Sequence, residues 1–126
     1  MTTNQDAIRR LFRAVNSYVG NLQAMPGIFP DYEAPVVRNG SNGDREMMLM
    51  RWGMPSPPQF AGAPITNIRN TNSPHWRRWR GPESRCLVPV NSFSEYAPAP
   101  NPETGKKDVV WFALDPARPL FAFAGL

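Results

Sequence analysis

Residues that bind metals or form crosslinks are scarce in this sequence. It contains one cysteine, Cys86, and one histidine, His75, so no internal disulfide can form and a metal site is not expected. We also expect no cofactor, and the low cysteine content is typical of a reducing, cytoplasmic setting. Free cysteine is usually buried, so we interpret Cys86 as a packing residue rather than a reactive thiol.

Long apolar runs are also missing, and acidic residues are absent from one part of the chain. No apolar stretch is long enough to span a bilayer, which argues against a membrane partner. Between Met47 and Pro82 there is no Asp or Glu, yet this window holds a group of arginines: Arg51, Arg69, Arg77, Arg78 and Arg80. The whole chain has a formal net charge of +4 and a pI of about 9.8. This distribution favours an acidic partner, of which nucleic acid is the commonest.

The first segment, residues 2–20, has the pattern of an amphipathic helix. Its apolar residues recur at helical spacing: Ile8, Leu11, Phe12, Val15 and Val19. Thr3 followed by Asp6 resembles a capping box, and Gly20 is a suitable end.

The rest of the chain reads mainly as strands. "APVVRNGSNGDREMMLMRWG" (34–53) predicts two strands around an Asn-Gly turn. "SPHWRRW" (73–79) predicts a short basic helix with Ser73 as its cap and Pro74 in its first turn. Further strands are predicted over 85–93, 108–114 and 119–126, with the last two joined by an Asp-Pro-Ala-Arg-Pro turn.

These elements predict an α+β domain built on a curved, mostly antiparallel sheet or open barrel. The proline-rich stretches "PSPPQFAGAP" and "APAPNPETG" are loops. The 126 residues suffice for one compact domain, but the apolar ending "LFAFAGL" predicts an incomplete one.

The strongest candidate binding residues are cationic and aromatic. Arg69, Arg77, Arg78 and Arg80 can pair with phosphates, and Trp76 and Trp79 can stack on bases. The alternative is that the tryptophans are core anchors, which we prefer for both, and that the arginines are a solvated surface. His75, beside Trp76, is either a surface residue or a phosphate contact.

Asn67, Arg69 and Glu95 are candidates for positioning and proton transfer. Asn67 and Arg69 alternate in an extended segment, so both side chains point to one side. Asn67 could orient a substrate oxygen, although a loop asparagine more often satisfies backbone groups. Glu95 lies between Phe93 and Tyr96, an environment suited to proton transfer, and equally it is a charged residue at a strand end.

Together, "MRWGMP", "ITNIRNT", "SRCLVPVNSFSEY", "VVWFAL" and "LFAFAGL" follow the order found in the SOS response-associated peptidase family, which the chain resembles over nearly its whole length. The resemblance implies a positive groove that holds single-stranded DNA in the bacterial cytoplasm, near the nucleoid. In that family a cysteine directly after the initiator methionine crosslinks covalently to abasic sites. The peptidase activity is self-processing that exposes this cysteine.

The resemblance also assigns roles to residues. Asn67 is similar to the family's active-site asparagine, Arg69 to its phosphate-binding arginine, and Glu95 to its catalytic glutamate, although Asn91 and Ser92 stand where Asp-Gly is usual. Thr2 follows Met1 where the nucleophilic cysteine is expected, and His75 is in the wrong motif to be the family's later histidine.

We therefore expect residues 1–126 to form a single, incomplete domain of this family that acts as a monomer. The first hypothesis is an abasic-site crosslinking protein that lacks its nucleophile. The second is a single-stranded DNA-binding module without catalysis. A third is a protein-interaction domain whose final strand is completed by a partner.

Overall fold

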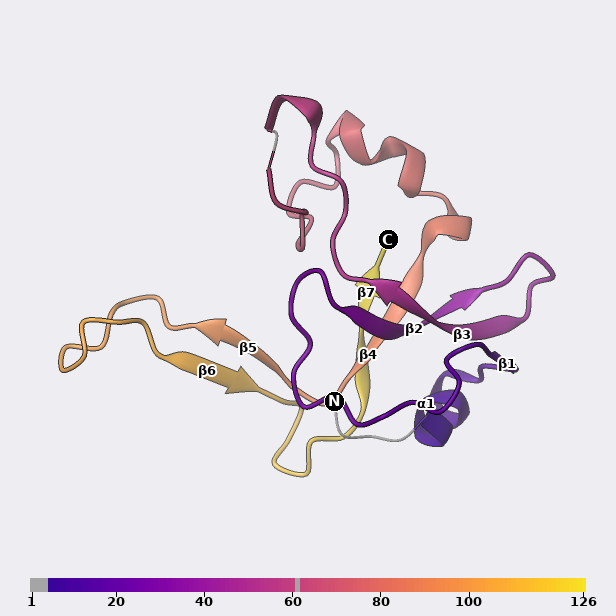
Figure 1. Ribbon diagram of the computed structural model, residues 1–126, viewed down its shortest axis with the longest axis horizontal. Coiled ribbons are helices and arrows are strands. Elements are labelled where there is room, and N and C mark those ends of the chain that lie inside the picture. The colour runs from indigo at the N-terminus through magenta and orange to yellow at the C-terminus, as the bar shows by residue number, and fades with distance from the viewer. Residues whose placement is uncertain (1–4, 61) are drawn as a thin grey trace.

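The computed structural model describes residues 5–60 and 62–126, and it contains one five-stranded sheet, one two-stranded hairpin and one α-helix (Figure 1). The sheet has the order β1-β3-β2-β4-β7, with β1 Asn16–Ser17, β2 Glu33–Asn39, β3 Arg45–Arg51, β4 Cys86–Val90 and β7 Phe121–Gly125. All neighbouring strands are antiparallel except β1 and β3. The predicted α+β class with a mostly antiparallel sheet is confirmed. The sheet is open and does not close into a barrel.

The β2–β3 hairpin forms where the Asn-Gly pairs predict it. Pairing runs from Glu33↔Arg51 at one end to Asn39↔Arg45 at the other. In the turn, the Gly40 amide donates to the Asp44 carbonyl at 2.7 Å, and Gly43 has a φ of 86°. Glycine adopts this left-handed conformation without the steric cost that a Cβ would bring.

The helix α1, Gln5–Phe12, is shorter than the predicted helix over 2–20, so that prediction is wrong in extent. Arg13 takes a left-handed conformation with a φ of 55°, and the Ala14 amide donates to the Arg9 carbonyl at 3.0 Å. These are the features of a Schellman helix end. The chain then pairs with β3 through the Val15 and Tyr18 amides, each 2.8 Å from its carbonyl acceptor. The predicted cap at Thr3 lies outside the described residues.

A cluster of buried side chains lies on one face of the sheet. Ile8 of α1, Ala14, Val19, Val37 of β2 and Met47 of β3 are buried together. Val37 lies opposite both Met47 and Leu87 in the ladders, so these side chains share the face that α1 covers. This packing holds α1 and the segment after it against the sheet.

The predicted strand over 85–93 is in fact two strands with different partners. After β4, the chain leaves the sheet at Asn91 and continues as β5, Phe93–Tyr96, which pairs with β6, Val109–Phe112. The hairpin projects away from the sheet (Figure 1). The strands predicted near the end are confirmed, but β6 does not pair with β7, because β7 returns to β4.

The long excursion between β3 and β4 contains three short 3-10 helices: η1 Pro58–Phe60, η2 Pro74–Trp79 and η3 Pro82–Ser84. The helix predicted over 73–79 is thus confirmed in place as a 3-10 helix. Ser73 stands at the N-cap position and Pro74 in the first turn, as predicted, but the Ser73 side chain makes no capping hydrogen bond. Within the described part of the chain, no helix is long and apolar enough to cross a membrane.

Candidate nucleic-acid interface

The segment that carries Asn67 and Arg69 is anchored to the end of β3. Met54 and Ile65 exchange backbone hydrogen bonds of 2.9 and 2.8 Å, and the Trp52 indole Nε1 donates to the Thr66 carbonyl at 3.0 Å. Asn67 and Arg69 are exposed, whereas Ile68 between them is partly buried. This alternation agrees with the expectation that both polar side chains point to one side.

No described residue holds the side chain of Asn67 or Arg69 by a hydrogen bond or ion pair. Both groups are therefore available to a ligand. The segment is fixed at its start by its hydrogen bonds to Met54 and Trp52, which limits the freedom that binding would remove.

Aromatic rings organise η2 from the inside. Trp76 is 6% exposed, and its ring lies 4.5 Å from the His75 ring and 6.0 Å from the Trp79 ring, centroid to centroid. His75 Nε2 lies 2.9 Å from the Pro55 carbonyl, so this nitrogen carries the proton and donates. Trp76 offers no free ring face to a base, and it packs as the core interpretation expects.

The arginines of this region differ in how firmly they are held. Arg80 donates to the Thr71 carbonyl at 3.0 Å, and the Arg78 guanidinium lies 3.9 Å from the centre of the Trp79 ring. Arg77 and Arg69 have no side-chain partner among the described residues. The ion pairs found in the described part of the chain join Arg38 to Glu46 and Arg51 to Asp31. The positive charge on and around η2 is therefore not neutralised by ion pairs with the described residues.

Glu95 lies on the separate β5–β6 hairpin, opposite Val110, and its side chain is exposed. Phe93 stacks on Phe112 at 5.2 Å and meets Phe123 of β7 edge-on at 5.2 Å, which fixes the base of the hairpin to the sheet. No described contact joins Glu95 to Asn67. Figure 1 shows the hairpin and the excursion that carries η2 extending in different directions.

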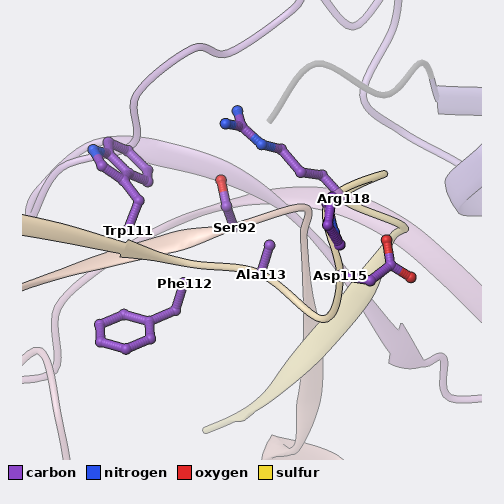
Figure 2. Close-up of a pocket in the computed structure, with 7 residues that line it drawn as sticks. Ser92, Trp111, Phe112, Ala113, Asp115 and Arg118 are labelled. Atoms are coloured by element: carbon purple, nitrogen blue, oxygen red, sulfur yellow. The ribbon is translucent and has the colours of Figure 1, made fainter.

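A hollow of about 470 Å³ lies where the hairpin meets the turn before β7. In Figure 2 the Trp111 indole, the Ser92 hydroxyl and the Arg118 guanidinium lie on one side of the ribbon, and Phe112 points to the other. None of the site residues predicted from the sequence lines this hollow. The hollow is therefore separate from the candidate site.

Cys86 occupies β4 opposite Gly125 and Arg38. Burial raises the pKa of its thiol, and the nearby Arg38 opposes this to a smaller extent. A Cβ at Gly125 would lie 2.7 Å from the Cys86 sulfur, so the thiol fills the space beside this glycine. A half-buried, protonated thiol is a packing group rather than a nucleophile.

The structure adds aromatic residues that the sequence analysis did not single out. Phe29, Tyr32 and Trp52 are exposed. Trp52 is hydrogen-bonded both to the turn that holds Phe29 and Tyr32 and to Thr66, directly before Asn67. The signal in the sequence was "FPDY", a proline-containing turn with an aromatic residue at each end. Among the described residues, no group of three His, Cys, Asp or Glu side chains could hold a metal ion.

Comparison with known proteins gives two findings. The family model for the SOS response associated peptidase (SRAP) matches residues 1–126. A structural genomics crystal structure of a protein from Bordetella bronchiseptica is similar with a TM-score of 0.57 and 19% identity, over 98% of this chain and 59% of that chain. The present chain thus spans less than two thirds of that protein, and the likeness shows the fold alone. No curated protein matches the sequence.

Proposed function

Since the chain belongs to the SOS response associated peptidase family, we propose that it holds single-stranded DNA that carries abasic sites. Membership supports a role in that family's handling of damaged DNA. The DNA-binding surface that we propose is the segment from Asn67 to Arg80, with the arginines and the anchored Asn67 segment as its two parts.

The observation that carries this proposal is the group of unneutralised arginines. Arg69, Arg77 and Arg78 are exposed, and none of them is ion-paired within the described part of the chain. Guanidinium groups bind phosphate oxygens through paired hydrogen bonds. Phosphate contacts give affinity and orientation without reading sequence, which suits a protein that must bind wherever a base is lost.

Within this surface we assign Arg69 to a phosphate and Asn67 to the sugar that has lost its base. Arg80 and His75 hold the surrounding loops through the Thr71 and Pro55 carbonyls, so they support the surface and can also approach a phosphate. Trp76 supports it from within. Glu95 is our candidate for proton transfer, and that role requires the DNA to reach from the Asn67 segment to the β5–β6 hairpin.

The covalent step known in the family places a special demand on the nucleophile. An amine condenses with the ring-opened sugar aldehyde and releases water, and a thiol on the same residue then adds to the imine carbon to close a thiazolidine. Only a cysteine at the chain's N-terminus has both groups free. Cys86 is internal, and its thiol is half-buried with a raised pKa. This observation favours the second candidate function, a DNA-binding module that does not crosslink through Cys86.

A labelled single-stranded oligonucleotide with one abasic site tests both functions. We expect the 126-residue chain to retard it on a native gel and to release it on a denaturing gel. A version with Met-Cys placed ahead of the helix should give a band that survives denaturation. Absence of any native complex would contradict the proposed function. A denaturation-resistant complex that disappears in Cys86→Ser would show that our assignment of Cys86 is wrong.

A further inference from the structure

Two aromatic side chains are exposed in the turn that leads into β2. Phe29 is 59% exposed and Tyr32 is 55% exposed. Large aromatic rings usually bury most of their surface, so an exposed pair at one point of a small domain suggests a contact surface. The turn lies outside the apolar core and belongs to no part of the function proposed above.

The local sequence holds these two rings in place. The Tyr32 amide donates to the Phe29 carbonyl at 3.0 Å, with Pro30 in the second position and Asp31, at a φ of 72°, in the third. These are the features of a type II turn, in which proline fixes the first corner. The ring of Phe29 meets that of Tyr32 edge-on, at 5.6 Å and an interplanar angle of 70°.

A glycine provides the space for the Phe29 ring. A Cβ at Gly27 would lie 2.9 Å from Cε2 and 3.3 Å from Cζ of Phe29, so the ring lies close over the Gly27 backbone. Any side chain at Gly27 would force the ring to move. A ring held by its own turn, by Tyr32 and by this close approach loses little freedom on binding a ligand.

The turn is fastened beside the proposed DNA-binding surface. The Asp31 amide donates to the Trp52 carbonyl at 2.8 Å, and the Trp52 amide donates to the Tyr32 carbonyl at 2.9 Å. The Trp52 indole in turn binds the Thr66 carbonyl, directly before Asn67. Trp52 thus links the Phe29–Tyr32 turn to the start of the Asn67 segment.

The negative charge within the turn has a cationic neighbour. The Asp31 carboxylate lies 3.4 Å from the Arg51 guanidinium, which offsets its charge.

We propose that the Phe29–Tyr32 turn is a stacking site for one unpaired base of the bound strand. This inference rests on the proposed function, since it needs single-stranded DNA at the Asn67 segment. Flat side chains stack on the faces of unpaired bases and tolerate any base, whereas a duplex covers those faces. The turn would thereby make the protein prefer single strands, in addition to the affinity that the arginines provide.

The test compares variants of the full chain for binding to a single-stranded oligothymidylate and to a blunt duplex. Tyr32→Leu and Phe29→Leu keep apolar bulk but lose the flat ring. Each should weaken single-strand binding about tenfold, the size expected for one lost stack, and leave duplex binding and the salt dependence unchanged. Tyr32→Trp keeps a flat ring and should bind single strands as tightly as the wild type. Gly27→Ala should weaken it by displacing the Phe29 ring.

Tyr18→Leu is the matched control, because Tyr18 is 65% exposed but follows β1, beside Met47. Equal affinities for the wild type and the Tyr32 and Phe29 variants would overturn the inference. So would an equal loss in Tyr18→Leu, or an equal loss on the duplex. The wild type could bind single strands, with a salt dependence that falls in Arg69→Ala, while the Tyr32 and Phe29 variants bind as tightly as the wild type. In that case only this inference fails. If the wild type binds no DNA, the proposed function fails with it.

Discussion

At the scale of single residues, the molecule separates arginines that hold the fold from arginines that remain available. Arg38 pairs with Glu46 at 2.7 Å, and Arg45 donates to the Phe12 carbonyl at 2.9 Å, which ties α1 to β3. Arg69 and Arg77 have no such task in the described structure. Composition alone gives the same charge to all four, so only the contacts distinguish structural arginines from candidate binding residues.

Replacing Arg69 with alanine should weaken binding to single-stranded DNA and reduce its salt dependence. One phosphate contact fewer lowers the slope of log K against log salt by about 0.7 for a single strand. Fluorescence anisotropy titrations at several salt concentrations measure this slope. Arg10→Ala is the control, because Arg10 lies on α1 and binds the Asp6 carbonyl. An unchanged slope in Arg69→Ala would remove Arg69 from the phosphate-binding set.

The residues of the candidate site could be found from the sequence, but their arrangement could not. Asn67 and Arg69 were identified from the "TNIR" pattern, and their shared exposure agrees with simple alternation. The position of Glu95 on a separate hairpin depends on which strand pairs with which, and local patterns do not contain that information. The exposure of Phe29 and Tyr32 could not be predicted, because an aromatic residue in a sequence is usually a core residue.

At the scale of elements, the β2–β3 hairpin was predictable and the end of α1 was not. The Asn-Gly pairs between β2 and β3 supply both the turn and its register. By contrast, Val15 and Val19 continue the helical spacing of α1 although they lie beyond its end. The Val15 and Tyr18 amides donate to carbonyls of β3 instead. Arg13 stands at a position where glycine is usual. The strand predicted over 85–93 is likewise too long. No charged residue or proline marks Asn91, where the chain leaves the sheet after β4.

Arg13→Gly should stabilise the protein by about 0.5–1 kcal/mol. Arg13 has a φ of 55° at the end of α1, and glycine takes this left-handed conformation without steric cost. Urea denaturation followed by circular dichroism gives the change in the free energy of unfolding. In the helix interior, Arg10→Gly should instead destabilise by about 1 kcal/mol. If both substitutions change the free energy of unfolding in the same direction, the left-handed helix end does not explain the effect of Arg13→Gly.

At the scale of the whole molecule, stability depends on a small set of buried side chains. Ile8 and Met47 are fully buried and connect α1, β3 and β2. Much of the remaining apolar surface, including the β5–β6 hairpin, is exposed. A small number of contacts therefore carries most of the burial that opposes unfolding.

Ile8→Ala should destabilise the protein by about 2–5 kcal/mol, because it removes buried methyl groups and leaves a cavity between α1 and the sheet. That loss is a large part of the stability of a small domain. Leu11→Ala on the same helix should have little effect, since Leu11 is 54% exposed. Thermal unfolding of the two variants side by side measures both. A Leu11→Ala loss as large as that of Ile8→Ala would place the core elsewhere.

The position of the β5–β6 hairpin in the chain has a consequence for the order of folding. The hairpin lies entirely within the connection between β4 and β7, which pair with each other in the sheet. Closing a long loop costs chain entropy that must be lost before its contacts form. A hairpin of neighbouring strands forms within microseconds, and once formed it brings Val90 and Phe121 closer together by shortening the free chain between them. The projecting hairpin thus lowers the kinetic barrier to docking β7, so the final strand joins the sheet as a near neighbour of β4 rather than a distant one.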